Sequence, residues 1–185
     1  MIDDVLSTCQ SRLKQAVDAL RQELGGIRTG RASASLVEHL RVDYHGVPTP
    51  LHQMASIGVP EARLITIQPW DRSVVGAVEK AILKSDLGII PQVDGALVRL
   101  VIPPLTEDRR RDMVKMVRRK VEEGRVEVRN VRRAGIEELR RLLRNKEVGE
   151  DEEHRAQDVL QKYTDQFTAE AEKVGQEKEK DLIAT

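Results

Sequence analysis

Three stretches of the chain repeat apolar residues at alternating steps of three and four, the spacing of an amphipathic helix with one buried face. The first begins at Ile2 and predicts a helix of about 25 residues that ends near Gly25 to Gly30, where glycines weaken helices. The second begins after Thr106 and runs to about residue 145. The third begins at Glu150, in an acidic turn that the positive end of a helix favours. The repeated apolar residues are Ile2, Leu6, Cys9, Leu13, Ala16, Leu20, Leu24 and Ile27, then Met113, Val117, Val121, Val128, Val131, Leu139 and Leu142, and finally Ala156, Leu160, Tyr163, Phe167, Ala171, Val174 and Leu182.

Between the first two helices the apolar period changes to two, which predicts strands. Residues 40–44, a His45-Gly46 turn and the residues from Val47 onward are typical of a hairpin. Residues 63–68 predict a buried strand. Residues 89–93 and 97–102 predict a second hairpin, closed by a two-residue loop at Asp94-Gly95.

A short helix is expected between these strands. Asp71 is a suitable N-cap because its carboxylate can accept a hydrogen bond from a free backbone N–H, and Gly88 can end the helix. We expect Trp70 to fill the core beside the start of this helix. Residues 31–104 therefore predict a small unit of mixed helix and strand.

None of the three long helices can bury its apolar face alone, so the first must fold back onto the other two. The predicted fold class is α+β: an elongated antiparallel three-helix bundle with an inserted small β/α/β domain, two lobes in an L shape. Residues 1–29 and 106–185 form the bundle, and residues 31–104 form the insertion. Hinges are expected at 29–31 and 103–106, in the residues Thr29, Gly30, Arg31, Pro103, Pro104 and Leu105.

Composition narrows the classes of function. Only 2% of the 185 residues are aromatic, too few for the stacking platforms of single-strand RNA binders. No stretch is long and apolar enough to span a bilayer, so we expect a cytoplasmic protein that does not bind membranes, and a monomer.

Cys9 is the only cysteine and is expected to be buried. The histidines share no helical spacing, so no metal site is expected; they are His39, His45, His52 and His154.

The charges balance overall, with 31 basic and 31 acidic residues, but they are unevenly distributed. Residues 106–146 contain fifteen basic and eight acidic residues, whereas residues 147–185 contain five and twelve. At 100° per residue, arginines of the second helix collect on one flank, with Glu122 as the one acid among them. We call this flank the arginine row; its members are Arg118, Arg125, Arg129, Arg132, Arg133 and Arg140.

Two interpretations of the arginine row remain open. Its members can be solvated or paired with the acids of the third helix, as most charged helix faces are. Alternatively, they can follow the phosphates of a folded RNA, because the planar guanidinium suits bidentate phosphate contact. Arg28 and Arg31 can extend such a basic surface.

A phosphate-binding loop is incomplete in this chain. Gly25 and Gly30 have the spacing of its glycines, but Arg31 and Ala32 stand where lysine and a hydroxyl residue are required, and a helix precedes the loop. The segment is therefore interpreted as a hinge or helix cap. No carboxylate lies isolated in an apolar run, so we expect no catalytic residue and no cofactor.

Three motifs follow one another along the chain: Arg-Thr-Gly-Arg-Ala-Ser at 28–33, Pro-Pro-Leu-Thr-Glu-Asp-Arg-Arg at 103–110 and Val-Arg-Asn-Val-Arg-Arg at 128–133. In this order they resemble the bacterial ribosome recycling factor family, and the resemblance extends over essentially the whole chain. The resemblance implies a non-enzymatic factor that binds the large ribosomal subunit after termination and separates the subunits with elongation factor G and GTP hydrolysis, which releases mRNA and tRNA.

The resemblance also implies which residues contact rRNA: Arg129, Arg132 and Arg133, with Arg28, Arg31 and Arg110 as auxiliaries and Arg125 added from the arginine row. Two glycines depart from the family pattern. Gly135 stands where a stronger helix former is usual, and Gly149 replaces a serine cap. A helical adaptor that binds protein partners through the charged bundle is the alternative function, and a small nucleotide-dependent enzyme is disfavoured by the incomplete loop.

Overall fold

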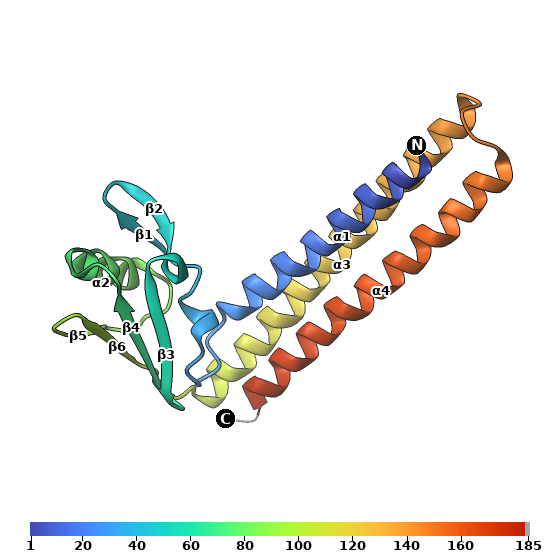
Figure 1. Cartoon of the computed structure of the whole chain (residues 1–185). Coiled ribbons are helices and arrows are strands. Elements are labelled where there is room, and N and C mark those ends of the chain that lie inside the picture. Colours follow the sequence, from blue (N-terminus) through green and yellow to red (C-terminus); the bar gives the residue numbers. More distant parts are fainter. Residues whose placement is uncertain (184–185) are drawn as a thin grey trace. The chain divides into compact units, whose positions relative to one another are not determined.

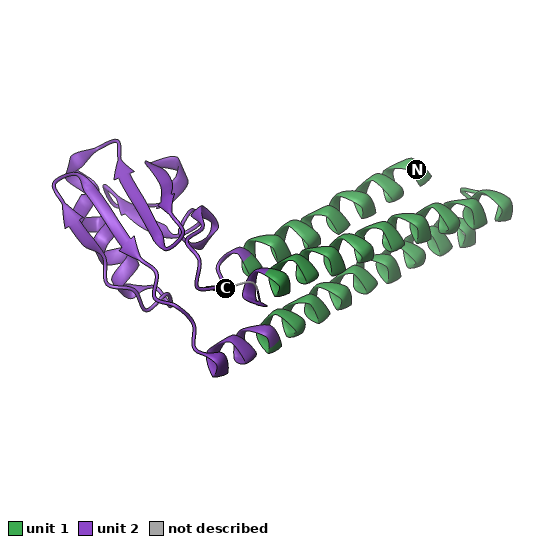
Figure 2. Cartoon of the chain, turned by 90° about the horizontal axis from the view of Figure 1, so that it is seen from below, with its two compact units in different colours: residues 1–24, 115–180 green, residues 25–114, 181–185 purple. Residues whose placement is uncertain are grey.

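The structure is a computed structural model that describes residues 1–183 (Figure 1). The chain divides into two compact units (Figure 2). Residues 1–24 and 115–180 form the first unit, and among the described residues 25–114 and 181–183 form the second.

Three long helices build the first unit: α1 (Ile2–Gly25), α3 (Glu107–Arg144) and α4 (Glu150–Ile183). The C-terminal ends of α1 and α4 and the N-terminal end of α3 extend into the second unit. They lie side by side in Figures 1 and 2. α3 runs antiparallel to both partners: its residues 124 and 135 meet residues 20 and 9 of α1, and its residues 121 and 135 meet residues 175 and 160 of α4. At 1.5 Å per residue, the 38 residues of α3 span about 57 Å. The predicted three-helix bundle is confirmed.

Close helix packing explains Gly135. A Cβ atom there would lie 2.6 Å from Cys9 Sγ and 2.8 Å from Leu160 Cδ2, well inside van der Waals contact. Cys9 is buried as expected, and burial raises the pKa of its thiol. Gly175 of α4 is equally constrained, because a Cβ there would collide with Val121 of α3. These glycines let the helix backbones approach closely.

The starts of α3 and α4 are capped by hydrogen bonds to side chains. Thr106 Oγ1 accepts the Arg109 backbone N–H at 3.3 Å at the start of α3. At the start of α4 the Gly149 N–H donates to Glu152 Oε2 at 2.9 Å, the half of a capping box that does not depend on the side chain at the cap. Glycine at position 149 therefore keeps one of the two hydrogen bonds that a serine would make.

The second unit contains two antiparallel sheets and one covering helix. β1 (Arg41–Tyr44) pairs with β2 (Val47–Pro50), and a four-stranded sheet has the order β3-β4-β6-β5. The helix α2 (Val75–Lys84) packs against β1 and β6 and buries Val75, Val78 and Ile82. The strands of the larger sheet are β3 (Ala55–Glu61), β4 (Leu64–Pro69), β5 (Gln92–Asp94) and β6 (Leu97–Val101), and short 3₁₀ turns occupy Ala34–Leu36, Leu51–Gln53 and Arg72–Val74.

Three local predictions were wrong in this unit. Trp70 does not fill the core: it is 69% exposed, because β4 buries its odd positions Ile65, Ile67 and Pro69, and residue 70 follows on the opposite side. The hairpin loop is Gly95-Ala96, since Asp94 pairs with Leu97. α2 ends at Lys84, before Gly88, where the Ser85 hydroxyl donates to the Ile82 carbonyl at 2.6 Å.

A polar contact ties the β1–β2 turn to the start of the helical segment before α2. His45 has a φ of +50°, unusual for a residue with a Cβ, and its Nε2 lies 3.1 Å from Asp71 Oδ2. The other carboxylate oxygen, Oδ1, accepts hydrogen bonds from the Ser73 hydroxyl at 2.7 Å and the Ser73 backbone N–H at 2.9 Å. These bonds, above all that of the Ser73 hydroxyl, lower the pKa of Asp71 to about 2.

We expect the Asp71 carboxyl to titrate near pH 2 in the folded chain, and its pKa to rise toward 3.8 in Ser73→Ala. A carboxyl whose pKa is lowered by folding stabilises the folded state above pH 3.8, and that contribution is lost as the pH falls through about 2. Carbon-detected NMR of the carboxyl groups measures both midpoints. His45→Ala should shift the midpoint less than Ser73→Ala, and equal midpoints in wild type and Ser73→Ala would contradict this assignment.

Candidate nucleic-acid interface

The arginine row of α3 lies against α4. The Arg118 guanidinium donates to both carboxylate oxygens of Glu179, at 2.9 and 3.5 Å. Arg125 pairs with Glu172, and the Arg132 Nε donates to Gln161 Oε1 at 2.7 Å. The α4 partners descend from 179 to 161 as the arginines ascend, as antiparallel helices require.

Within α3 itself, Glu122 connects two turns of the row. Its Oε1 accepts from Arg129 Nη2 at 2.7 Å, and its Oε2 lies 3.5 Å from Arg125 Nη1. Near the end of the row Arg140 pairs with Glu137 at 3.5 Å. Arg133 is exposed and forms no ion pair with any residue in 1–183.

These contacts do not bury the arginines. Glu179 raises the pKa of Arg118, and Glu172 is the largest cause of the raised pKa of Arg125. The Arg118 and Arg129 side chains remain 70% and 61% exposed. Exposed ion pairs contribute at most about 1 kcal/mol each, so an incoming phosphate can displace them. The row is thus partly paired with carboxylates and accessible along its edge.

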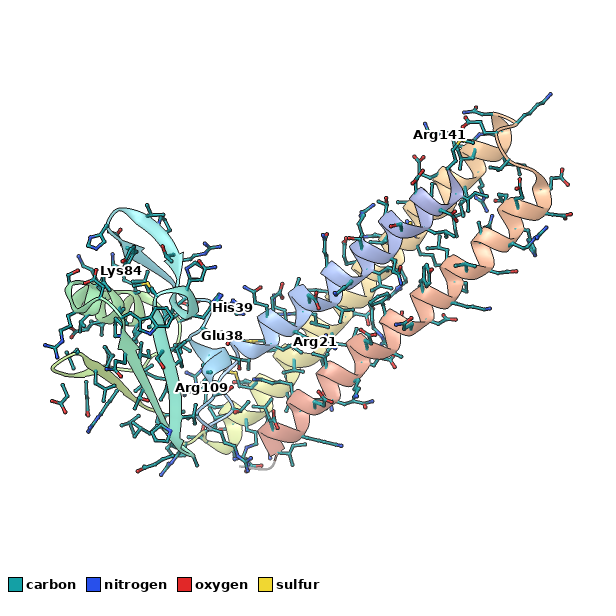
Figure 3. All side chains as sticks on the ribbon, in the orientation of Figure 1. Arg21, Glu38, His39, Lys84, Arg109 and Arg141 are labelled. Carbon is teal, nitrogen blue, oxygen red and sulfur yellow. The ribbon has the colours of Figure 1, made fainter. Side chains whose placement is uncertain are left out.

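Some other arginines of α3 lie outside the arginine row. Arg109 lies at the start of α3 and Arg141 near its end (Figure 3). Arg141 Nη2 lies 2.7 Å from Glu138 Oε2, one turn back on the same helix. At 100° per residue, Arg119, Arg141 and Arg144 fall outside the row, so they offer the same charge on another side of α3.

The auxiliary arginines lie in the second unit, near the linkers. Arg28 Nη1 lies 3.5 Å from the Leu87 carbonyl, whereas Arg31 is exposed and Arg110 is half-buried. They belong to a different compact unit from Arg125, Arg129, Arg132 and Arg133.

The two linkers meet at one turn of the sheet. The Ala32 N–H donates to the Ala62 carbonyl at 2.7 Å, and the Ile102 N–H donates to the Arg63 carbonyl at 2.8 Å. Gly30 has a φ of +82°, and a Cβ there would lie 3.4 Å from the Leu105 backbone nitrogen. The first linker is buried at Thr29 and Gly30, and Pro103 and Pro104 in the second are exposed.

Two further features of residues 1–183 bear on the class of site. No group of three or more histidine, cysteine, aspartate or glutamate side chains converges in this range as a metal site would require. No helix in the same range is long and apolar enough to cross a membrane.

A family model for the ribosome recycling factor matches residues 20–183, which is most of the chain. The chain belongs to the ribosome recycling factor family. The ribosome-recycling factor of Thermomicrobium roseum is 52% identical over 183 residues and covers 99% of both chains. That of Chloroflexus aurantiacus is 52% identical over 184 residues and covers both chains fully.

Solved structures agree with this membership. A solution structure of the ribosome recycling factor has a TM-score of 0.78 and 41% identity, covering 100% of this chain and 98% of that one. A second match is the T. thermophilus ribosome recycling factor in a structure that also contains E. coli elongation factor G, bound to the E. coli post-termination complex. It has a TM-score of 0.69 and 40% identity, and covers 98% of both chains.

Family membership confirms the resemblance that the three motifs indicated. The sequence did not predict the α4 side chains that contact the arginine row, chiefly Glu172, Glu179 and Gln161. The excess of acidic residues after residue 147 indicated that the third helix contains ion-pair partners for the arginine row. It did not identify them, because the register between two helices depends on how their apolar faces interlock.

Proposed function

We propose that this chain acts on the post-termination ribosome as a recycling factor, together with elongation factor G and GTP hydrolysis, and separates the subunits so that mRNA and tRNA are released. The observation that carries this proposal is the match to named recycling factors over 98–100% of the chain at about 50% identity. The structural neighbour bound to a post-termination complex with elongation factor G supports the same partners.

We further propose that the arginine row contacts rRNA of the large subunit through Arg125, Arg129, Arg132 and Arg133. The row's exposure and its charge support this assignment, since guanidinium groups bind phosphate oxygens in a bidentate fashion. Arginines fixed along a helix would recognise backbone spacing and shape more than base identity. Arg28, Arg31 and Arg110 are proposed as auxiliary contacts.

We propose hinges at 29–31 and 103–106, which permit the inserted domain at 31–104 to move relative to the bundle of 1–29 and 106–185. The closeness of the two linkers supports a paired hinge, because Gly30 of the first lies beside Leu105 of the second. Residues Thr29, Arg31, Pro103, Pro104 and Leu105 complete the proposed hinges. α3 would serve as a lever, since a continuous helix of 38 residues transmits displacement with little bending.

In this proposal the chain itself catalyses no reaction and works in the cytoplasm, where bacterial ribosomes function. GTP hydrolysis belongs to elongation factor G, and this chain contributes binding and mechanical coupling. The proposal therefore requires no cofactor and no catalytic side chain in the chain.

Two measurements test the proposal. Purified large subunits should bind the chain with an affinity that falls as salt rises from 50 to 200 mM, because phosphate contacts release counterions. Post-termination ribosomes supplied with the chain, elongation factor G and GTP should dissociate, as measured by light scattering. Salt-insensitive or absent binding to subunits, with no dissociation, would instead favour a helical adaptor for protein partners.

A further inference from the structure

Glu122 occupies an unusual place in the charge pattern of α3. It lies within the arginine row, where every other charged member is basic. Its two carboxylate oxygens contact different arginines, Arg129 at 2.7 Å and Arg125 at 3.5 Å. One acid therefore contacts two of the four arginines proposed for rRNA contact in the first unit.

The Glu122 contacts are not needed to hold the bundle together. The Glu122 side chain is 54% exposed and the Arg129 side chain 61%, so water screens their attraction. The bundle is held by an apolar core that includes Val117, Val128 and Val131 of α3. Exposed pairs of this kind contribute little to the free energy of unfolding, so stability does not explain an acid at this position.

A carboxylate and a phosphate compete for the same guanidinium edge. Both present anionic oxygens that accept N–H bonds, and the Arg129 Nη2 atom already donates to Glu122. A phosphate that binds through Arg129 Nη2 must compete with this carboxylate, and a phosphate on any other edge of the guanidinium still experiences the repulsion of its negative charge.

We propose that Glu122 is an internal competitor for RNA phosphate, which positions Arg125 and Arg129 in the free chain and weakens the binding of the row to rRNA. This inference rests on the proposed contact between the row and rRNA. Its consequence is kinetic: because differences in affinity among variants of one interface arise mainly in dissociation, Glu122 shortens the time that the chain stays bound. Fast release suits a factor that must leave before the next round.

The chain offers a matched control at Glu127. Glu127 lies on the same helix, is exposed, and forms no ion pair in the described part of the chain. At 100° per residue it falls on the flank opposite the row. Glu122→Gln and Glu127→Gln therefore change the net charge equally, and only the first removes the carboxylate that contacts Arg125 and Arg129, while Arg125 keeps its pair with Glu172.

Binding of both variants to purified large subunits tests the proposal. Glu122→Gln should bind about 3-fold tighter than wild type at low salt, the scale of one exposed ion pair, with a slower dissociation rate. Its salt slope should steepen by up to about 1, as expected for one further phosphate contact. Glu127→Gln should remain close to wild type. Equal affinities of the two variants, or weaker binding of Glu122→Gln, would overturn the proposal.

A second background separates competition from a general change of shape or charge. In Arg129→Ala the carboxylate of Glu122 has lost its closest partner, so adding Glu122→Gln should increase affinity much less than it does in the wild-type chain. An undiminished gain would contradict the proposal. Wild-type chain that binds subunits without salt sensitivity would refute the proposed rRNA contact itself, and the role of Glu122 would fall with it.

Discussion

Replacing Arg129, Arg132 and Arg133 together with alanine should weaken binding to large ribosomal subunits by on the order of 100-fold at low salt. Each guanidinium that contacts a phosphate contributes roughly 1–3 kcal/mol, and the three contributions overlap because neighbouring charges share counterions. The salt slope should fall by about 2, since fewer counterions are released. Sedimentation or fluorescence titration with purified subunits at several salt concentrations measures both quantities.

The matched control changes the same number of charges on the same helix. Arg119, Arg141 and Arg144 lie outside the row, and their combined replacement with alanine should reduce affinity only a few-fold through the loss of long-range attraction. Melting temperatures should show that both triple variants remain folded. Equal losses in the two variants would mean that net charge, and not the arginine row, determines binding.

Gly135→Ala should destabilise the bundle by about 1–2 kcal/mol. Alanine is the better helix former by up to about 1 kcal/mol, but its Cβ would lie 2.6 Å from Cys9 Sγ, and overpacking of this kind costs about 1–3 kcal/mol. Urea denaturation followed by circular dichroism measures the difference. Gly76→Ala in α2 is the control: apart from its chain neighbours and the adjacent helix backbone, no atom lies within 4 Å of its Cβ position, so the substitution should be neutral or stabilising.

A second substitution identifies the atom responsible. Cys9→Ala removes Sγ, so Gly135→Ala should cost less in the Cys9→Ala background than in wild type, a positive coupling between the two sites. Only the far end of Leu160 would then remain close, and a flexible side chain can move aside. Independent effects of the two substitutions would show that the sulfur atom does not limit the approach of α1 to α3.

The long helices could be predicted closely because an amphipathic period repeated over more than twenty residues has few alternative explanations. The end of α3 at Arg144 and the start of α4 at Glu150 agree with the sequence-based expectation to within a residue. The strand β3 was missed, because Gly58 and Pro60 interrupt its pattern. Both residues are tolerated there since β3 is an edge strand with an irregular register between Gly58 and Glu61.

The candidate site was predictable in its residues but not in its contacts. Helical spacing alone places Arg125, Arg129 and Arg132 on one flank, and this required no tertiary information. Whether Arg132 meets a carboxylate or the amide of Gln161 depends on how far α4 is shifted along α3. That shift follows from packing details such as the room that Gly135 and Gly175 provide, which no periodicity encodes. Trp70 is exposed despite its size, because the alternation of β4 buries Pro69 and places the next residue on the opposite side.

The anchoring of Ala32 and Ile102 to the consecutive residues Ala62 and Arg63 has a consequence for how the chain tolerates rearrangement. A segment whose first and last residues are fastened to one turn can close upon itself before α3 and α4, which follow it in the chain, have been made. It can therefore fold early during synthesis, while α4 is still to be translated. Such a segment can also be exchanged or removed as a module during evolution, because its two ends lie close together and a short linker can rejoin the chain on either side of it.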